Sequence, residues 1–143
     1  MPVVDTNVLV YAADADSPFH EKCSAWLERQ RGRPDAWHTT WGILYEFLRV
    51  TTHPRVMRRP WTVTDAWSFV SILLASPGLE VLIPTERHAL VAAQVFSELS
   101  FIGGNLLHDA HTAILMREHG IRRICTRGAD FHRFPFLEVV DPL

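Results

Sequence analysis

Short apolar segments alternate with longer stretches of helical periodicity along the whole chain, and this alternation most limits the possible folds. The apolar segments are too short for helices and match buried strands, whereas the longer stretches repeat apolar residues every three or four positions, as amphipathic helices do. The expected strands are residues 2–4, 36–39, 81–83, 123–125 and 137–140. The expected helices are residues 7–13, 17–31, 41–51, 64–75, 86–99 and 106–119.

Strands separated by helices indicate an α/β protein with a mostly parallel central sheet between helical layers. No repeat, low-complexity tract or linker interrupts the pattern, so residues 1–143 are expected to form a single domain. No apolar run approaches the ~18 residues of a membrane helix, and no signal peptide is recognisable. We therefore expect a cytoplasmic protein without membrane contact, in which Cys23 and Cys125 are reduced core residues.

The formal net charge of −2 argues against a protein that holds nucleic acid through a broad positive field. Basic residues are concentrated locally instead, since Arg55, Arg58 and Arg59 share one short segment. Together with Arg49 and Arg127 they are candidates for contacts with RNA phosphates. A solvated basic loop explains the same segment equally well.

Four acidic residues occupy positions at which a site can form. Asp5 and Asp130 follow expected strands, and the carboxyl ends of parallel strands share the edge of the sheet where ligands bind. Asp109 lies near the start of helix 106–119, and Glu46 lies beside the apolar stripe of helix 41–51. Each also has a structural explanation: a helix cap for Asp5, an ion pair with Arg49 for Glu46, the helix dipole for Asp109 and a turn for Asp130.

Convergence of these carboxylates would have a chemical consequence. Like charges held close together raise the pKa of at least one of them. A divalent cation relieves that repulsion, and Mg²⁺ and Mn²⁺ prefer oxygen ligands. Cations of this type activate water for attack on phosphodiesters. The sequence permits such a site without proving that the four residues meet.

The motifs that carry these residues occur in a characteristic order: DTN after the first strand, then ILYEFLRV, HDAHTA and TRGADF. In this order the chain resembles a PIN domain, and specifically the VapC toxins of bacterial toxin–antitoxin pairs. The resemblance implies an α/β/α sandwich and an endoribonuclease dependent on Mg²⁺ or Mn²⁺. It assigns Asp5, Glu46, Asp109 and Asp130 to the catalytic quartet, with Asp5, Asp109 and Asp130 as metal ligands.

The resemblance also implies supporting residues. Thr6, Asn7 and Thr126 match polar positions around the first aspartate, where the Thr6 hydroxyl is expected to orient carboxylates. Glu46, with its pKa raised, is expected to position or deprotonate the attacking water, which leaves a 5′-phosphate and a 3′-hydroxyl. Many relatives carry Asp or Asn where this chain has Gly128, which predicts a looser site at Asp130. His108 and His111 are expected to be structural, because their spacing puts them on other helix faces than Asp109.

The implied partners are those of a VapC-like toxin. They are a VapB-like antitoxin that places a basic side chain against the carboxylates and alone contacts DNA, a second copy of the chain in a homodimer, and a tRNA or ribosomal RNA substrate.

Other functional classes are less compatible with the residues. A receiver domain needs a lysine near its last strand, and the only lysine is Lys22. A haloacid-dehalogenase-type phosphatase needs aspartate where this chain has Asn7. A catalytically inactive PIN-like module that binds RNA or protein remains the main alternative, although such modules usually lack part of the acidic quartet.

Overall fold

The computed structural model, which describes residues 1–143, contains one sheet of five strands in the order β3-β2-β1-β4-β5. Every neighbouring pair of strands is parallel, so the expected mostly parallel sheet is entirely parallel. The strands are β1 (Val3–Val4), β2 (Trp37–Thr40), β3 (Leu79–Leu82), β4 (Arg123–Cys125) and β5 (Glu138–Val140).

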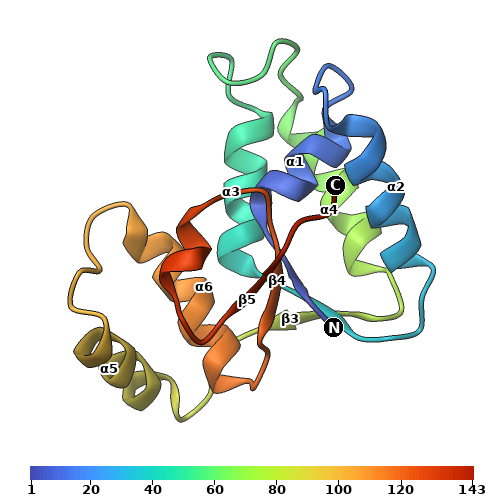
Figure 1. The fold of residues 1–143 in the computed structure, drawn as a ribbon. Coiled ribbons are helices and arrows are strands. Elements are labelled where there is room, and N and C mark those ends of the chain that lie inside the picture. Colours follow the sequence, from blue (N-terminus) through green and yellow to red (C-terminus); the bar gives the residue numbers. More distant parts are fainter.

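Helices cover both faces of the sheet, as the alternating sequence pattern predicted. Figure 1 shows α2 and α4 on one side and α5 and α6 on the other, with α1 and α3 near the end at which β1 and β4 terminate. The α-helices are α1 (Thr6–Ala13), α2 (His20–Arg31), α3 (Trp41–Thr51), α4 (Val63–Leu74), α5 (His88–Glu98) and α6 (Leu106–Glu118), and a 3₁₀ helix, η1, spans Asp130–Arg133.

The order of the strands creates a switch point between β1 and β4. The chain runs outward from β1 through β2 to β3, and then returns to the other side of β1 to add β4 and β5. The backbone N–H of Asp5 donates to the carbonyl of Cys125 at 3.0 Å, so the segments that leave the two strands begin side by side. In open α/β sheets this crevice is the usual position of a ligand.

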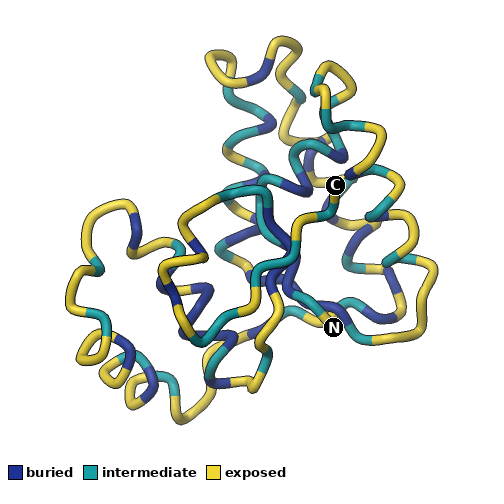
Figure 2. The backbone as a smooth tube through the Cα atoms, in the orientation of Figure 1, coloured by how far each residue is buried: buried dark blue, intermediate teal, exposed yellow.

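The core surrounds the central strands, which are buried along most of their length (Figure 2). Its largest fully buried side chains include Trp37 in β2, Phe47 in α3, Phe131 in η1 and Phe134 directly after η1. Cys23 and Cys125 are both buried and free of disulfides, as predicted. No helix is long and apolar enough to cross a membrane.

The first turn of α2 differs from the sequence prediction. Ser17 and Pro18 were expected to cap and begin this helix, but its first residue is His20. The Ser17 hydroxyl instead accepts a hydrogen bond from the Phe19 N–H at 3.1 Å, which forms a local turn ahead of the helix. Serine side chains commonly form such turns in competition with helix starts.

A buried carboxylate ties α6 to the start of α5. Glu118 accepts hydrogen bonds from the backbone N–H and the hydroxyl of Thr85, at 2.7 and 2.5 Å, and is also paired with His88. Burial alone would raise the pKa of Glu118, but these hydrogen bonds outweigh it and hold the pKa below its ordinary value. The charged carboxylate therefore stabilises this end of the sandwich.

Candidate active site

A cleft of about 420 Å³ opens beyond the carboxyl ends of β1 and β4, at the switch point of the sheet. All four acidic residues singled out in the sequence line this cleft, although they come from four different segments. The full lining is Asp5, Thr6, Asn7, Val10, Tyr11, Glu46, Val50, Val56, His108, Asp109, Gly128, Asp130 and Phe131.

Asp5 has two structural tasks at once. It is the N-cap of α1, where its Oδ1 accepts from the Thr6 backbone N–H at 2.7 Å. Its Oδ2 accepts from the Thr126 hydroxyl at 2.8 Å and from the Asn7 amide at 3.3 Å. Burial raises the pKa of Asp5, and the hydrogen bonds from the Thr126 hydroxyl and the Thr6 N–H oppose that increase. The Asp5 side chain thus caps α1 and lines the cleft at the same time.

Asn7 and Thr126 form a bridge between the segments that follow β1 and β4. The Asn7 amide donates to the Thr126 hydroxyl oxygen at 3.0 Å, and Asn7 Oδ1 accepts from the Arg127 N–H at 3.1 Å. The Gly128 N–H also donates to the Thr126 hydroxyl oxygen, at 2.9 Å. This bridge holds Oδ2 of Asp5 in place relative to the loop that leads to Asp130, while Oδ1 is held by the Thr6 N–H.

Gly128 packs closely against that bridge. A Cβ atom at this position would lie 3.2 Å from the Asn7 amide nitrogen and 3.4 Å from the Thr126 hydroxyl oxygen. The Asp or Asn that many relatives carry here would therefore require Asn7 to shift. Glycine at position 128 therefore fits closely against Asn7 and Thr126, where a larger residue would not fit without a shift.

The Thr6 side chain does not orient a carboxylate, contrary to the expectation from the sequence. Its hydroxyl donates to the backbone carbonyl of Ile43, at 3.4 Å, and so links α1 to α3. Only the Thr6 backbone N–H contacts Asp5. Of the two threonines expected to support the site, Thr126 is the one whose hydroxyl reaches a carboxylate.

Asp109 lies in the first turn of α6 and is half-buried in the cleft. Burial, followed by the negative charges of Asp5 and Asp130, raises its pKa to about 6. Asp130 begins η1 and is exposed, while the next residue, Phe131, is buried and anchors the turn. Three aspartates therefore face one another closely enough for their charges to interact.

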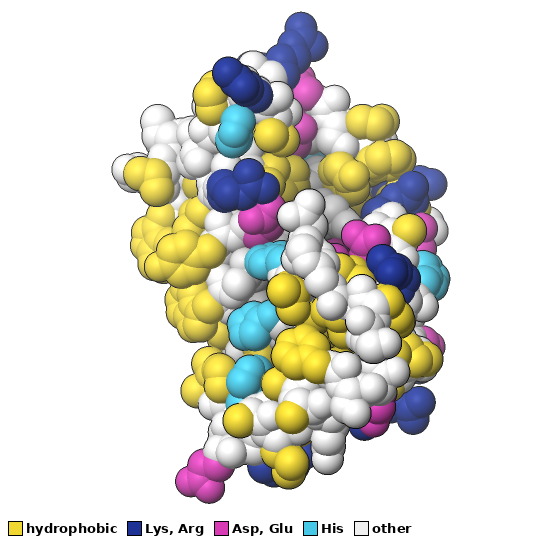
Figure 3. Space-filling model, turned by 90° about the vertical axis from the view of Figure 1, so that its left-hand side faces the viewer, with side chains coloured by type: hydrophobic (Ala, Val, Ile, Leu, Met, Phe, Trp, Pro, Cys, Tyr) yellow, Lys and Arg dark blue, Asp and Glu magenta, His cyan; other side chains and the backbone are white.

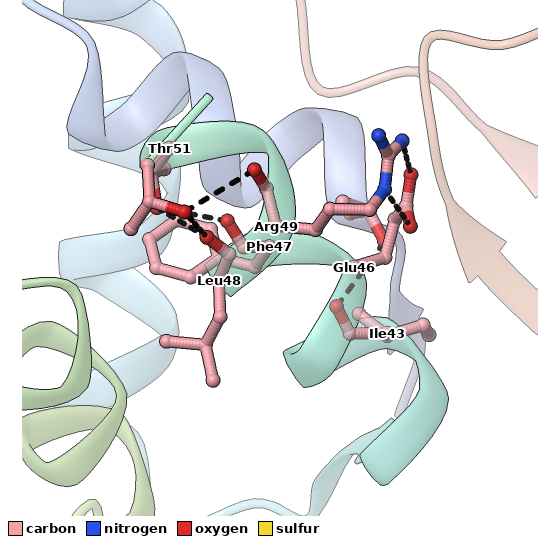
Figure 4. Close-up of polar contacts among 8 residues, drawn as sticks. Ile43, Glu46, Phe47, Leu48, Arg49 and Thr51 are labelled. Carbon is pink, nitrogen blue, oxygen red and sulfur yellow. Dashed lines mark hydrogen bonds and ion pairs between the residues drawn. The ribbon is translucent and has the colours of Figure 1, made fainter. Parts of the chain in front are cut away.

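Glu46 differs from the three aspartates because it has a basic partner. Arg49, one turn later on α3, donates from Nε to Glu46 Oε2 at 2.9 Å and from Nη2 to Oε1 at 2.5 Å, as Figure 4 shows. The hydrogen bond from Arg49 lowers the pKa of Glu46. The expected increase in the pKa of Glu46 is thus wrong, because the neighbouring guanidinium outweighs the effect of burial.

His108 was expected from the sequence to have a structural role, but it lines the cleft. It is the only basic side chain in the lining, and its positive form would favour the charged states of Asp5, Asp109 and Glu46. His111 instead lies against His88, with ring centroids 5.9 Å apart. A row of histidine side chains is visible on this face of the molecule in Figure 3. The sequence signal that could have indicated a place in the cleft for His108 is its position directly before Asp109.

The five candidate arginines lie in different environments. Arg59 binds Asp16 through two hydrogen bonds, at 3.0 and 2.8 Å. Arg127 pairs with Asp141 at 3.2 Å, and its guanidinium lies 4.4 Å from the centre of the Phe19 ring. Arg49 is paired with Glu46, and the exposed Arg55 and Arg58 form no ion pair.

The chemistry of the acidic side chains suits a hard divalent cation. Asp5, Asp109 and Asp130 form no ion pair with any basic residue, so no salt bridge neutralises their combined negative charge. Carboxylate oxygens are the ligands that Mg²⁺ and Mn²⁺ prefer. As the side chains stand, no group of three or more Asp, Glu, His or Cys residues is arranged to enclose an ion. Asp130 is the exposed member of the set.

The family model for the PIN domain matches residues 3–137 of this chain. That range begins with β1 and includes all four cleft carboxylates. The chain belongs to the PIN-domain family.

Its curated relatives are similar over nearly their whole length. Ribonuclease VapC43 of Mycobacterium tuberculosis is 38% identical, with 100% of this chain and 96% of the relative covered. Ribonuclease VapC48 of the same species is 31% identical, with 96% and 94% covered.

Solved structures confirm the fold at lower identity. VapBC2 from Rickettsia felis, crystallised with a DNA fragment from its promoter, superposes with a TM-score of 0.69 at 18% identity and covers 97% of this chain and 96% of its own. Mycobacterium tuberculosis VapC20, described as a sarcin-ricin loop cleaving toxin, gives 0.68 at 19% identity, with 97% and 98% covered.

Proposed function

We propose that this protein is the toxin of a toxin–antitoxin pair and that it hydrolyses RNA as an endoribonuclease dependent on Mg²⁺ or Mn²⁺. The observation that carries the proposal is the group of three aspartates, Asp5, Asp109 and Asp130, which share one cleft without a basic partner. Full-length similarity to proteins named VapC ribonucleases supports the class of reaction.

The aspartates are the proposed ligands of the cation, which supplies positive charge for the phosphate and activates water when bound. Asp5 is held in place for this task by Thr126 and Asn7, and these hydrogen bonds keep its oxygens from rotating. In the free protein Asp109 keeps its proton to a higher pH than an ordinary aspartate, because its pKa is raised to about 6. Asp130 completes the set from the exposed side.

Glu46 is the proposed residue that orients the attacking water. Its carboxylate lines the cleft on the α3 side, and in the free protein the Arg49 guanidinium keeps it ionised. In-line attack by this water would leave a 5′-phosphate and a 3′-hydroxyl. For this role Glu46 must lie within hydrogen-bond distance of the attacking water.

The relatives support proposals for the partners and the substrate. The similar VapBC structures are antitoxin complexes, which supports a VapB-like antitoxin as the inhibitor of this protein. We propose tRNA or ribosomal RNA as the substrate, a homodimer as the assembled toxin, contact with DNA only through the antitoxin, and action in the cytoplasm. The exposed Arg55 and Arg58 can contact RNA phosphates without leaving an acidic partner, since neither forms an ion pair.

The test is cleavage of total tRNA and ribosomal RNA by antitoxin-free protein in Mg²⁺, in Mn²⁺ and in EDTA. Asp5→Asn and Asp109→Asn variants, each shown to be folded by circular dichroism, serve beside the parent protein. Asp35→Asn is the matched control, because Asp35 is an exposed aspartate outside the cleft that is paired with Arg33.

We expect discrete fragments with 5′-phosphate ends that require the cation and disappear in both cleft variants but not in the control. Fragments with 2′,3′-cyclic phosphate ends would contradict the water-attack mechanism. RNA binding without cleavage by folded, metal-loaded protein would contradict the nuclease and favour an inactive PIN-like binding module.

A further inference from the structure

Arg49 occupies both oxygens of a cleft carboxylate that the proposed reaction needs. Its guanidinium faces Glu46 through two hydrogen bonds, at 2.9 and 2.5 Å, with the two side chains extended toward each other from the same side of α3 (Figure 4). The other three acids of the cleft have no such partner. The pair is therefore a specific feature of the Glu46 corner of the site.

The position of the pair makes it easy to separate. The Arg49 side chain is 60% exposed, whereas that of Glu46 is 29% exposed. Glu46 lines the cleft and Arg49 does not, so the guanidinium lies on the solvent side of the carboxylate. Ion pairs that reach into solvent are weakly held and exchange partners readily.

The chemistry of the guanidinium fits a second partner at the same place. Its planar donors match a phosphate as well as a carboxylate, and both can be bound through two parallel hydrogen bonds. An RNA strand that crosses the cleft must carry phosphates past the Glu46 corner. Such a phosphate and the Glu46 carboxylate would compete for the same donors.

We propose that Arg49 is an exchangeable partner of Glu46, which an RNA phosphate takes over when the substrate enters the cleft. In the free protein Arg49 holds the Glu46 carboxylate at the edge of the cleft. With RNA bound, Arg49 binds the phosphate, and Glu46 is released to orient water. Arg49 thus contacts the substrate and also controls the position of Glu46, and the inference rests on the proposed function because it requires RNA in this cleft.

The exchange predicts a coupling between the two residues in RNA binding. Because the phosphate must displace Glu46, removal of the Glu46 charge should strengthen RNA binding when Arg49 is present. The same change should have little effect when Arg49 is absent, apart from the loss of one negative charge. A double-mutant cycle isolates this coupling from the separate effects.

The cycle is measured with fluorescein-labelled bulk tRNA by anisotropy, in EDTA and in an Asp109→Asn background, so that the probe is not cleaved. Glu46→Gln, Arg49→Gln and the double variant are compared across a salt series. The matched control is the pair Glu28 and Arg31 on α2, which has the same three-residue spacing, with a 2.7 Å contact, and lies outside the cleft. Circular dichroism and thermal unfolding establish that all variants are folded.

We expect Glu46→Gln to tighten tRNA binding about threefold with Arg49 present and less than about 1.5-fold in the Arg49→Gln background, a coupling within the range seen for contacting residues. Arg49→Gln should weaken binding and reduce the salt slope by about 0.7–0.9, as the loss of one phosphate contact does. Substitutions of the Glu28–Arg31 pair should change neither quantity. Additive effects in the cycle, with normal tRNA binding by the Asp109→Asn parent, would overturn the exchange alone. Absence of tRNA binding by that parent at low salt would overturn both the exchange and the proposed function.

Discussion

Removal of the Thr126 hydroxyl is the sharpest test of how the hydrogen bonds hold the site together. This side chain is 1% exposed and takes part in three hydrogen bonds. It donates to Asp5 Oδ2 at 2.8 Å and accepts from the Asn7 amide at 3.0 Å and from the Gly128 N–H at 2.9 Å. Replacement by valine keeps the volume and removes all three.

The expected cost of Thr126→Val follows from the partners left behind. A buried polar group without a hydrogen bond costs about 1–3 kcal/mol. Asp5 keeps a weaker bond from Asn7 at 3.3 Å, and the Asn7 amide therefore keeps one acceptor. We expect the free energy of unfolding to fall by about 2–4 kcal/mol, which is less than the loss of three independent bonds. Urea unfolding at pH 7, followed by circular dichroism, measures this change.

Two further variants serve as controls. Thr126→Ser retains the hydroxyl and should recover most of the stability. Thr39 is also buried, but its hydroxyl has no hydrogen-bond partner. Thr39→Val should therefore leave the stability unchanged or raise it. Equal effects of valine at positions 39 and 126, or of serine and valine at position 126, would refute the hydrogen-bond account.

Three other predictions concern stability away from the cleft. The pKa of Glu118 lies below its ordinary value in the folded state, so its stabilisation is full above the unfolded value of about 4.3 and is lost as the pH falls through the folded value. The free energy of unfolding of the parent and of Glu118→Gln should be measured from about pH 3 to 7. The two values should differ by a constant amount above pH ~5 and converge in acid. A constant difference at every pH would contradict this. His88→Ala should lower the melting temperature by removing one partner of that carboxylate, and an unchanged melting temperature would show that the contact is not stabilising. Gly78→Ala should destabilise strongly, because its Cβ would lie 2.3 Å from the Asp35 carbonyl oxygen, whereas Gly103→Ala meets no atom within 4 Å; similar melting temperatures would contradict the packing.

The elements of the fold were predictable where periodicity and end signals agreed. The helix at Trp41–Thr51 and the strand at Arg123–Cys125 match the predicted bounds, and Gly120, with φ +72°, follows the end of α6 as expected. The start of α2 was not predictable from Ser17 and Pro18, because a serine hydroxyl can stabilise a turn as well as a helix cap.

The site was predictable in its residues but not in its contacts. The strand order, which places Asp5 beside the segment after β4, is a long-range property that no local pattern contains. For the same reason the sequence did not show that Thr126 bonds to Asp5 from 121 positions away. The direction of the Glu46 pKa was wrong because the rotamer of Arg49 decides it, and spacing alone permits the pair without fixing its geometry.

The central claim is that the unpaired aspartates of the cleft bind a divalent cation. The most direct measurement is a titration of the RNA-free protein with Mn²⁺ at pH 7, followed by calorimetry and by the electron paramagnetic resonance of free Mn²⁺. We expect a saturable Mn²⁺ site in the parent and in Asp35→Asn. This site should be lost or greatly weakened in Asp5→Asn and Asp109→Asn. Equal Mn²⁺ binding by all four proteins, or no binding by the folded parent, would contradict it.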